Sequence, residues 1–189
     1  MSFSGIVFDF DHTLASLQIK DFIFSPQAAS IFIHMMKLCD RNRGFRQPAL
    51  SQNIRSVLGN ESFTKFTDYS RRLYRPQHIQ PIALQIIQAC DKYHIPRAVL
   101  SDHPCLDKLR AIGLEKGWSC VAHCQTYNAL KPLPDALYAV SAQIGVPTNR
   151  LVVIGDRHDS DGLMAQSAGA EFVHIDQATH LLQRIRNKV

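Results

Sequence analysis

The sequence lacks several features that would point to a secreted or membrane protein. It has no apolar run long enough to span a bilayer, and its first residues show no basic region, separate apolar stretch or cleavage site. It contains no internal repeat and no low-complexity tract, so a repeat array is not expected. We therefore expect a cytoplasmic globular protein.

The cysteines show no pattern of a disulfide-rich protein. The five cysteines are an odd number without the spacing of a disulfide framework, so we expect free thiols. Cys120, His123 and Cys124 look like a fragment of a zinc site, but no second pair of ligands follows at a suitable distance. A structural zinc centre is therefore not expected.

The net charge of +5 is unevenly spread along the 189 residues. Residues 14–95 contain eleven Lys or Arg against five Asp or Glu, a balance of +6, whereas the remainder has ten against eleven, a balance of −1. This asymmetry fits a segment that meets an anionic partner, and it equally fits a solvated helical surface.

The hydrophobic pattern changes character along the chain. Residues 14–95 show helical spacing throughout, with a fourth helix that begins near residue 81. Elsewhere, short apolar runs typical of strands alternate with helical patterns. Strands are expected at residues 5–9, 97–100, 118–122, 151–154 and 171–175. Helices are expected at residues 105–112, 134–144, 161–168 and 178–187. The alternation predicts an α/β fold: a Rossmann-like three-layer parallel sheet core (1–13 and 96–189) with a small helical cap (14–95) inserted after the first strand.

Two aspartates stand where the first apolar run ends. Asp9 directly follows Gly5-Ile-Val-Phe and Asp11 stands two residues later, at the carboxyl edge where α/β sheets place their chemistry. Two carboxylates so close together can divide the work, one as a nucleophile and one as a proton donor. The spacing predicts a catalytic pair.

Polar residues also follow two later strands. Asp156, Asp159 and Asp161 come after the run that ends at Ile154, and such excess negative charge is usually offset by a hard cation with oxygen ligands. Ser101 ends another run, where a hydroxyl next to a helix start suits phosphate oxygens. Lys131 would supply positive charge for an attack on an anionic phosphorus.

These residues occur in the order of four motifs. Asp9-Phe10-Asp11-His12-Thr13 resembles the DxDxT motif of the haloacid dehalogenase-like (HAD) superfamily, and Ser101 and Lys131 resemble its second and third motifs. The segment from Gly155 to Asp161 resembles its acidic fourth motif, in the style of phosphoglycolate phosphatase-like branches. The position of the helical insert resembles a C1-type cap.

The resemblance implies a role for each residue. Asp9 would be the nucleophile that forms an aspartyl-phosphate, and Asp11 the general acid and base. Asp9, Asp156 and the Asp11 backbone carbonyl would hold Mg²⁺. The remaining roles are phosphate binding by Ser101, Lys131 and Asp102, ordering of the loop by Thr13, and orientation of metal waters or of Lys131 by Asp161 and Asp159. For Asp102, capping of the following helix is the alternative.

The reaction implied is hydrolysis of a phosphomonoester. Dehalogenase branches lack an acid at position 11, because a halide leaves without a proton, whereas an alkoxide benefits from one. A C1-type cap favours a small phosphorylated metabolite over a protein or a long nucleic acid. No membrane partner is expected. Three alternatives remain: a phosphotransferase or phosphomutase with the same intermediate, a non-catalytic binding protein with a basic cap, and a nucleic-acid end-processing phosphatase.

Overall fold

Five parallel strands form a single sheet in this computed structural model, which describes residues 3–18, 21 and 72–187. The strand order is β3-β2-β1-β4-β5. The strands are β1 (Gly5–Phe8), β2 (Arg97–Ser101), β3 (Cys120–His123), β4 (Leu151–Gly155) and β5 (Glu171–His174). The helices are α4 (Pro81–Lys92), α5 (Leu106–Ala111), α6 (Asp135–Ile144), α7 (Leu163–Ser167) and α8 (Ala178–Arg186). The predicted α/β, Rossmann-like parallel sheet is confirmed.

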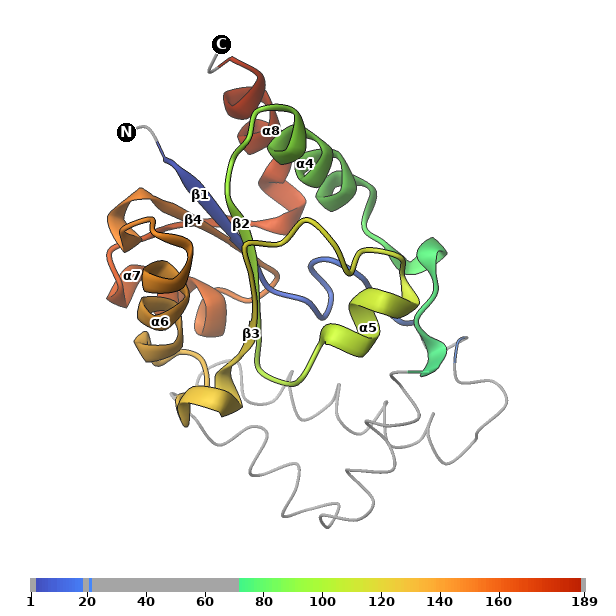
Figure 1. The fold of residues 1–189 in the computed structure, drawn as a ribbon, viewed down its shortest axis with the longest axis horizontal. Helices are drawn as coiled ribbons and strands as arrows, with labels where there is room; N and C mark the ends of the chain where they lie inside the picture. The colour runs from blue at the N-terminus through green and yellow to red at the C-terminus, as the bar shows by residue number, and fades with distance from the viewer. Residues whose placement is uncertain (1–2, 19–20, 22–71, 188–189) are drawn as a thin grey trace.

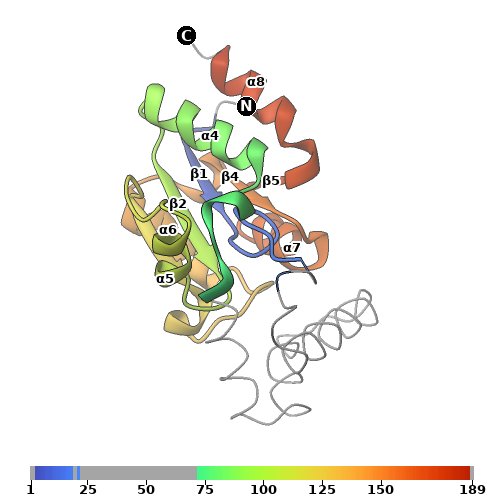
Figure 2. The ribbon, with the colours of Figure 1, turned by 90° about the vertical axis from the view of Figure 1, so that its right-hand side faces the viewer.

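The sheet is buried on both faces, as parallel sheets require. Successive residues of β1 point to opposite sides, so that Ile6 and Phe8 join one core cluster and Val7 joins the other. Helices α4, α5 and α8 contribute to the first cluster, and α6 and α7 to the second. Figures 1 and 2 show α4 and α8 side by side, with α6 on the other side of the sheet. The core therefore has three layers.

Helix α4 belongs with the sheet in this structure. We expected the helix beginning near Pro81 to be part of the cap, but α4 buries Ala83, Ile86 and Cys90 in the cluster that contains Phe8. The amphipathic pattern identifies the helix but does not say which surface it covers. The rest of the predicted cap falls mainly on residues 22–71, outside the described residues, so the domain division stays a prediction.

The two segments that flank residues 22–71 run beside each other. The Ser16 N–H donates to the His78 carbonyl and the Gln80 N–H donates to the Leu14 carbonyl, each at 2.9 Å. This pairing holds the chain around Tyr74 close to the loop that follows β1. Residues more than sixty positions apart are therefore brought to the same edge of the sheet.

That edge is a topological switch point. From β1 the chain proceeds through β2 and β3 on one side, then returns to place β4 on the other side of β1. Ligands of open α/β sheets bind where the strand order reverses in this way, at the carboxyl ends of the strands. Asp9 follows β1 and Asp156 follows β4, so both lie at the switch point.

Two further expectations concern cysteines and membranes. Cys90, Cys105, Cys120 and Cys124 are buried and are not joined in disulfides within the described residues, as predicted, while Cys39 lies outside the described residues. Among the helices that the structure describes, none is long and apolar enough to cross a membrane.

Candidate active site

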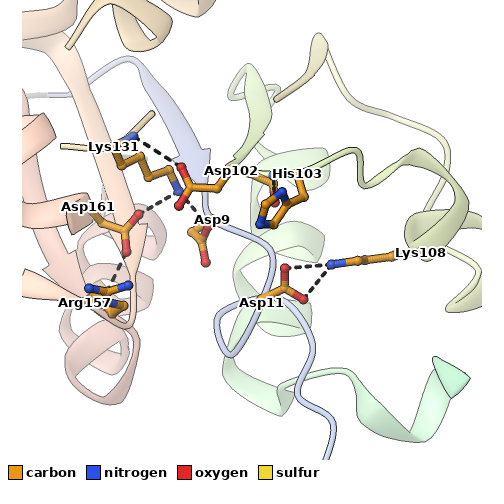
Figure 3. A network of polar contacts seen from close by, with 9 residues as sticks. Asp9, Asp11, Asp102, His103, Lys108, Lys131, Arg157 and Asp161 are labelled. Carbon is orange, nitrogen blue, oxygen red and sulfur yellow. Dashed lines mark hydrogen bonds and ion pairs between the residues drawn. The ribbon is translucent and has the colours of Figure 1, made fainter. Parts of the chain in front are cut away.

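Lys131 forms ion pairs with two carboxylates, those of Asp9 and Asp161, which are far apart in the sequence. Its Nζ lies 2.6 Å from Oδ1 of Asp9 and 2.7 Å from Oδ1 of Asp161, and all three residues are buried (Figure 3). Buried charges are stable only when they are paired and hydrogen-bonded. The arrangement therefore fixes the Asp9 carboxylate beside a permanent positive charge.

Asp156 completes a cluster of three carboxylates. One oxygen atom from each of Asp9, Asp156 and Asp161 lies within 4.8 Å of the others. In the described part of the chain, these three residues form the one group of acidic, His or Cys side chains that could hold a metal ion. Carboxylate oxygens are the ligands that Mg²⁺ and Ca²⁺ prefer. The donor set therefore fits the cation expected from the sequence.

Gly155 makes room for this cluster. A Cβ at this position would clash with Cβ and Cγ of Asp161, so the side chain of Asp161 lies directly against the backbone of β4. The backbone N–H of Arg157 donates to Oδ2 of Asp161 at 3.3 Å, which fixes the second oxygen of that carboxylate. A π-helical turn, His158–Gly162, precedes α7 and carries Asp161 into this position. We expected a regular helix from residue 161 instead.

The pKa values reflect how closely these charges are packed. Burial raises the pKa of Asp9 well above its ordinary value, and the Asp161 and Asp156 carboxylates add to this effect while Lys131 opposes it. Burial and Asp161 also raise the pKa of Asp156. Burial lowers the pKa of Lys131, but Asp161 and Asp9 outweigh it, so the ammonium is retained. One ammonium does not neutralise three carboxylates, and a divalent cation would lower the pKa of Asp9.

Asp11 belongs to a separate network. Lys108 Nζ lies 2.7 Å from both of its carboxylate oxygens, and the Tyr74 hydroxyl donates to Oδ1 at 2.6 Å. Figure 3 shows the Asp11 carboxylate facing Lys108, apart from Asp9 and Lys131. Burial alone would raise the pKa of Asp11, but Lys108 and Tyr74 outweigh it and lower the pKa to about 2. In this arrangement Asp11 is a carboxylate at neutral pH.

Two further predicted phosphate-binding residues, Ser101 and Asp102, lie at the end of β2 and directly after it. Ser101 is buried at the end of β2, and its Oγ accepts a hydrogen bond from the His103 N–H at 3.4 Å. Asp102 Oδ1 accepts from the backbone N–H of Lys131 at 3.3 Å. The alternative that Asp102 caps the following helix is wrong, because α5 begins at Leu106 with Cys105 in the N-cap position. Asp102 instead holds the loop that carries Lys131.

Two residues expected in supporting roles make different contacts. Thr13 is fully buried, and its Oγ1 has no hydrogen-bond partner within the described residues. Asp159 pairs with the Arg157 guanidinium at 2.8 and 3.1 Å, a contact that does not involve Lys131. Which of the predicted site residues bind substrate or metal stays a prediction.

Sequence reasoning missed Lys108, Tyr74 and His174. Lys108 stands between Asp107 and Arg110 on a helix and looks like one more surface charge. Tyr74 is 63 residues from Asp11, and its position depends on the pairing of the two flanking segments. His174 Nε2 is hydrogen-bonded to the Asp156 carbonyl at 2.8 Å. In the sequence, the one feature that could have pointed to His174 is its place near the end of the last predicted strand.

Comparison with known proteins supports the resemblance drawn from the motifs. The family model described as HAD-hydrolase-like matches residues 129–187, which include Lys131, Asp156 and Asp161. No curated protein matches the chain.

Solved structures show the fold over almost the whole length. A β-phosphoglucomutase from Clostridium difficile is 12% identical with a TM-score of 0.73 and 98% of each chain covered. A predicted phosphoglycolate phosphatase from Haemophilus somnus 129PT is 19% identical with a TM-score of 0.65, covering 95% of this chain and 91% of that one. The L-2-haloacid dehalogenase RSc1362 is 14% identical with a TM-score of 0.70, covering 98% and 100%. The chain thus has the fold of HAD-superfamily hydrolases and matches their family model over residues 129–187, which confirms the resemblance inferred from its four motifs.

Proposed function

We propose that this protein is a Mg²⁺-dependent phosphatase that hydrolyses a small phosphorylated metabolite through an aspartyl-phosphate on Asp9. The observation that carries the proposal is the position of Asp9: a buried carboxylate at the switch point, 2.6 Å from Lys131 and within 4.8 Å of two further carboxylates. This set provides a nucleophile, a cation for the phosphoryl group and oxygen ligands for a metal.

The chain's own residues account for both half-reactions. An oxygen of Asp9 attacks phosphorus, the ester P–O bond breaks, and Asp11 gives a proton to the leaving oxygen. Water then attacks phosphorus, Asp11 takes its proton, and the bond between phosphorus and Asp9 breaks to release phosphate. Lys131 and Ser101 bind the phosphoryl oxygens throughout.

Asp11 begins this cycle as a carboxylate in the arrangement described above. A phosphate dianion bound next to it would raise its pKa, because a neighbouring charge of the same sign favours the protonated acid. Substrate binding would therefore favour uptake of a proton from solvent by Asp11, and Asp11 would pass this proton to the leaving oxygen. The carboxylate form is then regenerated and serves as the base in the second half-reaction.

Asp9, Asp156 and the Asp11 backbone carbonyl would hold Mg²⁺, and the structure adds Asp161 as a carboxylate within reach of the same cluster. When bound, the cation would neutralise negative charge on the phosphoryl group. The hydrogen bond between His174 and the Asp156 carbonyl would orient this part of the site.

The test is phosphate release from a panel of phosphorylated metabolites, with Mg²⁺ or EDTA, for the wild type and Asp9→Asn. We expect selective turnover that EDTA abolishes and that Asp9→Asn lowers by a factor on the order of 10³ or more. Asp107→Asn is the matched control, because Asp107 is an exposed carboxylate that pairs with Arg110 on α5. Full activity in a folded Asp9→Asn variant would refute the proposal.

A phosphotransferase is the second candidate, because one structure with this fold is a β-phosphoglucomutase. It would use the same two aspartates but pass the phosphoryl group to a sugar hydroxyl. Adding sugar acceptors to the panel separates the two: faster transfer to sugar than to water would identify the transferase.

A further inference from the structure

Helix α5 carries one buried cation among exposed charges. Asp107 and Arg110 pair with each other at 3.0 Å, with 64% and 60% of their side chains exposed. The Lys108 side chain is only 8% exposed. Lysine is rarely buried unless it is paired, because the loss of hydration costs more than packing returns. The burial of Lys108 therefore calls for a specific partner.

That partner is Asp11, and two aromatic rings also lie close to the Lys108 ammonium. Lys108 Nζ reaches both oxygens of Asp11 at 2.7 Å and lies 5.1 Å and 5.4 Å from the ring centroids of Phe10 and Tyr74. The two rings meet edge to face at 5.3 Å. Aromatic faces attract an ammonium, so they hold Lys108 in position while its N–H groups point at Asp11.

Tyr74 supplies a further constraint on the same carboxylate. Its hydroxyl donates to Oδ1 at 2.6 Å, and the ring is almost fully buried. Asp11 follows β1, Tyr74 comes from the second flanking segment, and Lys108 comes from α5. Two other parts of the chain thus converge on the Asp11 side chain, which is itself 38% exposed.

We propose that Lys108, assisted by Tyr74, is the positioning residue of Asp11. This role rests on the proposed function, in which Asp11 moves the proton in both half-reactions. A partly exposed carboxylate on a loop has several rotamers, and fixing one of them before the reaction removes an entropic cost from the barrier.

The competing role for Lys108 is direct recognition of a second anionic group on the substrate. The two roles differ in their dependence on Asp11. A positioning residue has nothing to act on when Asp11 is removed, whereas a substrate-binding cation keeps its effect. A double-mutant cycle between positions 108 and 11 therefore distinguishes them.

The experiment measures kcat and KM for Lys108→Met in the wild type and in Asp11→Asn. Turnover of all four proteins is followed with the same substrate, p-nitrophenyl phosphate, whose leaving group needs no proton, so the cycle reports on the second half-reaction, in which Asp11 takes a proton from water. We expect Lys108→Met alone to lower kcat by about tenfold to a hundredfold with KM changed less than about threefold. In the Asp11→Asn background the same change should alter kcat less than about twofold.

Two further variants complete the design. Arg110→Met removes a cation from the exposed face of the same helix and should leave kcat and KM unchanged. Tyr74→Phe removes only the hydroxyl, so it tests the network even if Lys108→Met fails to fold. It should lower kcat by a smaller factor, and that loss should also vanish in the Asp11→Asn background.

Three outcomes would overturn the proposal. A rise in KM at unchanged kcat in Lys108→Met would assign Lys108 to substrate binding. Equal losses of kcat in both backgrounds would show that Lys108 acts independently of Asp11. If Lys108→Met changes neither kcat nor KM, Lys108 has no role in the reaction. If the wild type releases no phosphate, the proposed function fails and this role fails with it. The contact itself is tested without activity, by non-additive effects of Lys108→Met and Asp11→Asn on the denaturant midpoint.

Discussion

A single missing side chain, at Gly155, determines where Asp161 lies. A methyl group there would occupy the space of the Asp161 side chain, which Lys131 and the Arg157 N–H hold from the other side. We therefore expect Gly155→Ala to displace Asp161 from Lys131. The free energy of unfolding should fall by about 1–3 kcal/mol, a typical cost of overpacking, and phosphate release should fall at least about tenfold.

Gly145→Ala is the matched control for that change. Gly145 ends α6 with φ 70° and faces open space, so a Cβ costs backbone strain of about 1–2 kcal/mol without touching the site. Its phosphate release per folded molecule should equal that of the wild type. Urea unfolding and phosphate assays on both variants check the prediction. Wild-type activity in Gly155→Ala would show that phosphate release does not depend on Asp161 lying against Gly155.

The site could be predicted from the sequence where a strand end places the residue. Asp9, Ser101 and Asp156 follow apolar runs, and a parallel sheet brings such ends to one edge. Lys108 could not be predicted, because periodicity shows that a residue lies on a helix but not which carboxylate that helix will face. The partner of Tyr74 depends on the pairing of two distant segments, which no local pattern encodes.

At the scale of elements, an ion pair joins the last strand to the last helix. Both Nη atoms of Arg184 on α8 contact the Glu171 carboxylate on β5, one at 2.9 Å, and the hydrogen bond from Arg184 lowers the pKa of Glu171 below 4.5. Because the folded state lowers this pKa, the pair stabilises the protein fully above pH 4.5, and its contribution is lost as the pH falls through the folded value.

Glu171→Gln should therefore lower the free energy of unfolding at pH 7 by about 0.2–1 kcal/mol, the range for a partly exposed pair. The difference from the wild type should shrink as the pH falls below 4.5. Urea unfolding at several values between pH 7 and pH 3 measures it. A difference that stays constant over this range would mean that the loss comes from packing and not from charge.

Elements with strong periodicity were predicted close to their observed ends, as for α6 and α8, whereas weaker patterns were misplaced. The strand expected at 118–122 is β3, Cys120–His123, because Trp118 leaves the strand to donate its indole N–H to the Leu114 carbonyl at 2.6 Å. Its ring packs edge to face on Phe8 at 5.8 Å. A tertiary contact thus overrides a local β-pattern. Before α7, a π-helical turn stands where a regular helix was expected.

At the scale of the whole molecule, folding gathers like charges that are far apart in the unfolded chain. Asp9, Asp156 and Asp161 converge within 4.8 Å around one ammonium, that of Lys131, which leaves two uncompensated negative charges when all three carboxylates are ionised. This repulsion opposes folding, and a divalent cation at the cluster would remove it. Stability and metal binding are therefore linked.

The linkage predicts that Asp156→Asn changes the melting temperature differently without and with Mg²⁺. With EDTA, Asp156→Asn should melt at or above the wild-type temperature, because it removes one of the repelling charges. With Mg²⁺ at about 100 times its dissociation constant, the wild type should gain about 2.7 kcal/mol, or about 5–10 °C in melting temperature, and Asp156→Asn should gain little. Thermal unfolding of both proteins, with Asp107→Asn as the exposed control, measures this without any substrate. An equal Mg²⁺ shift in Asp156→Asn would place the cation elsewhere, because loss of a ligand carboxylate must weaken a site that depends on it.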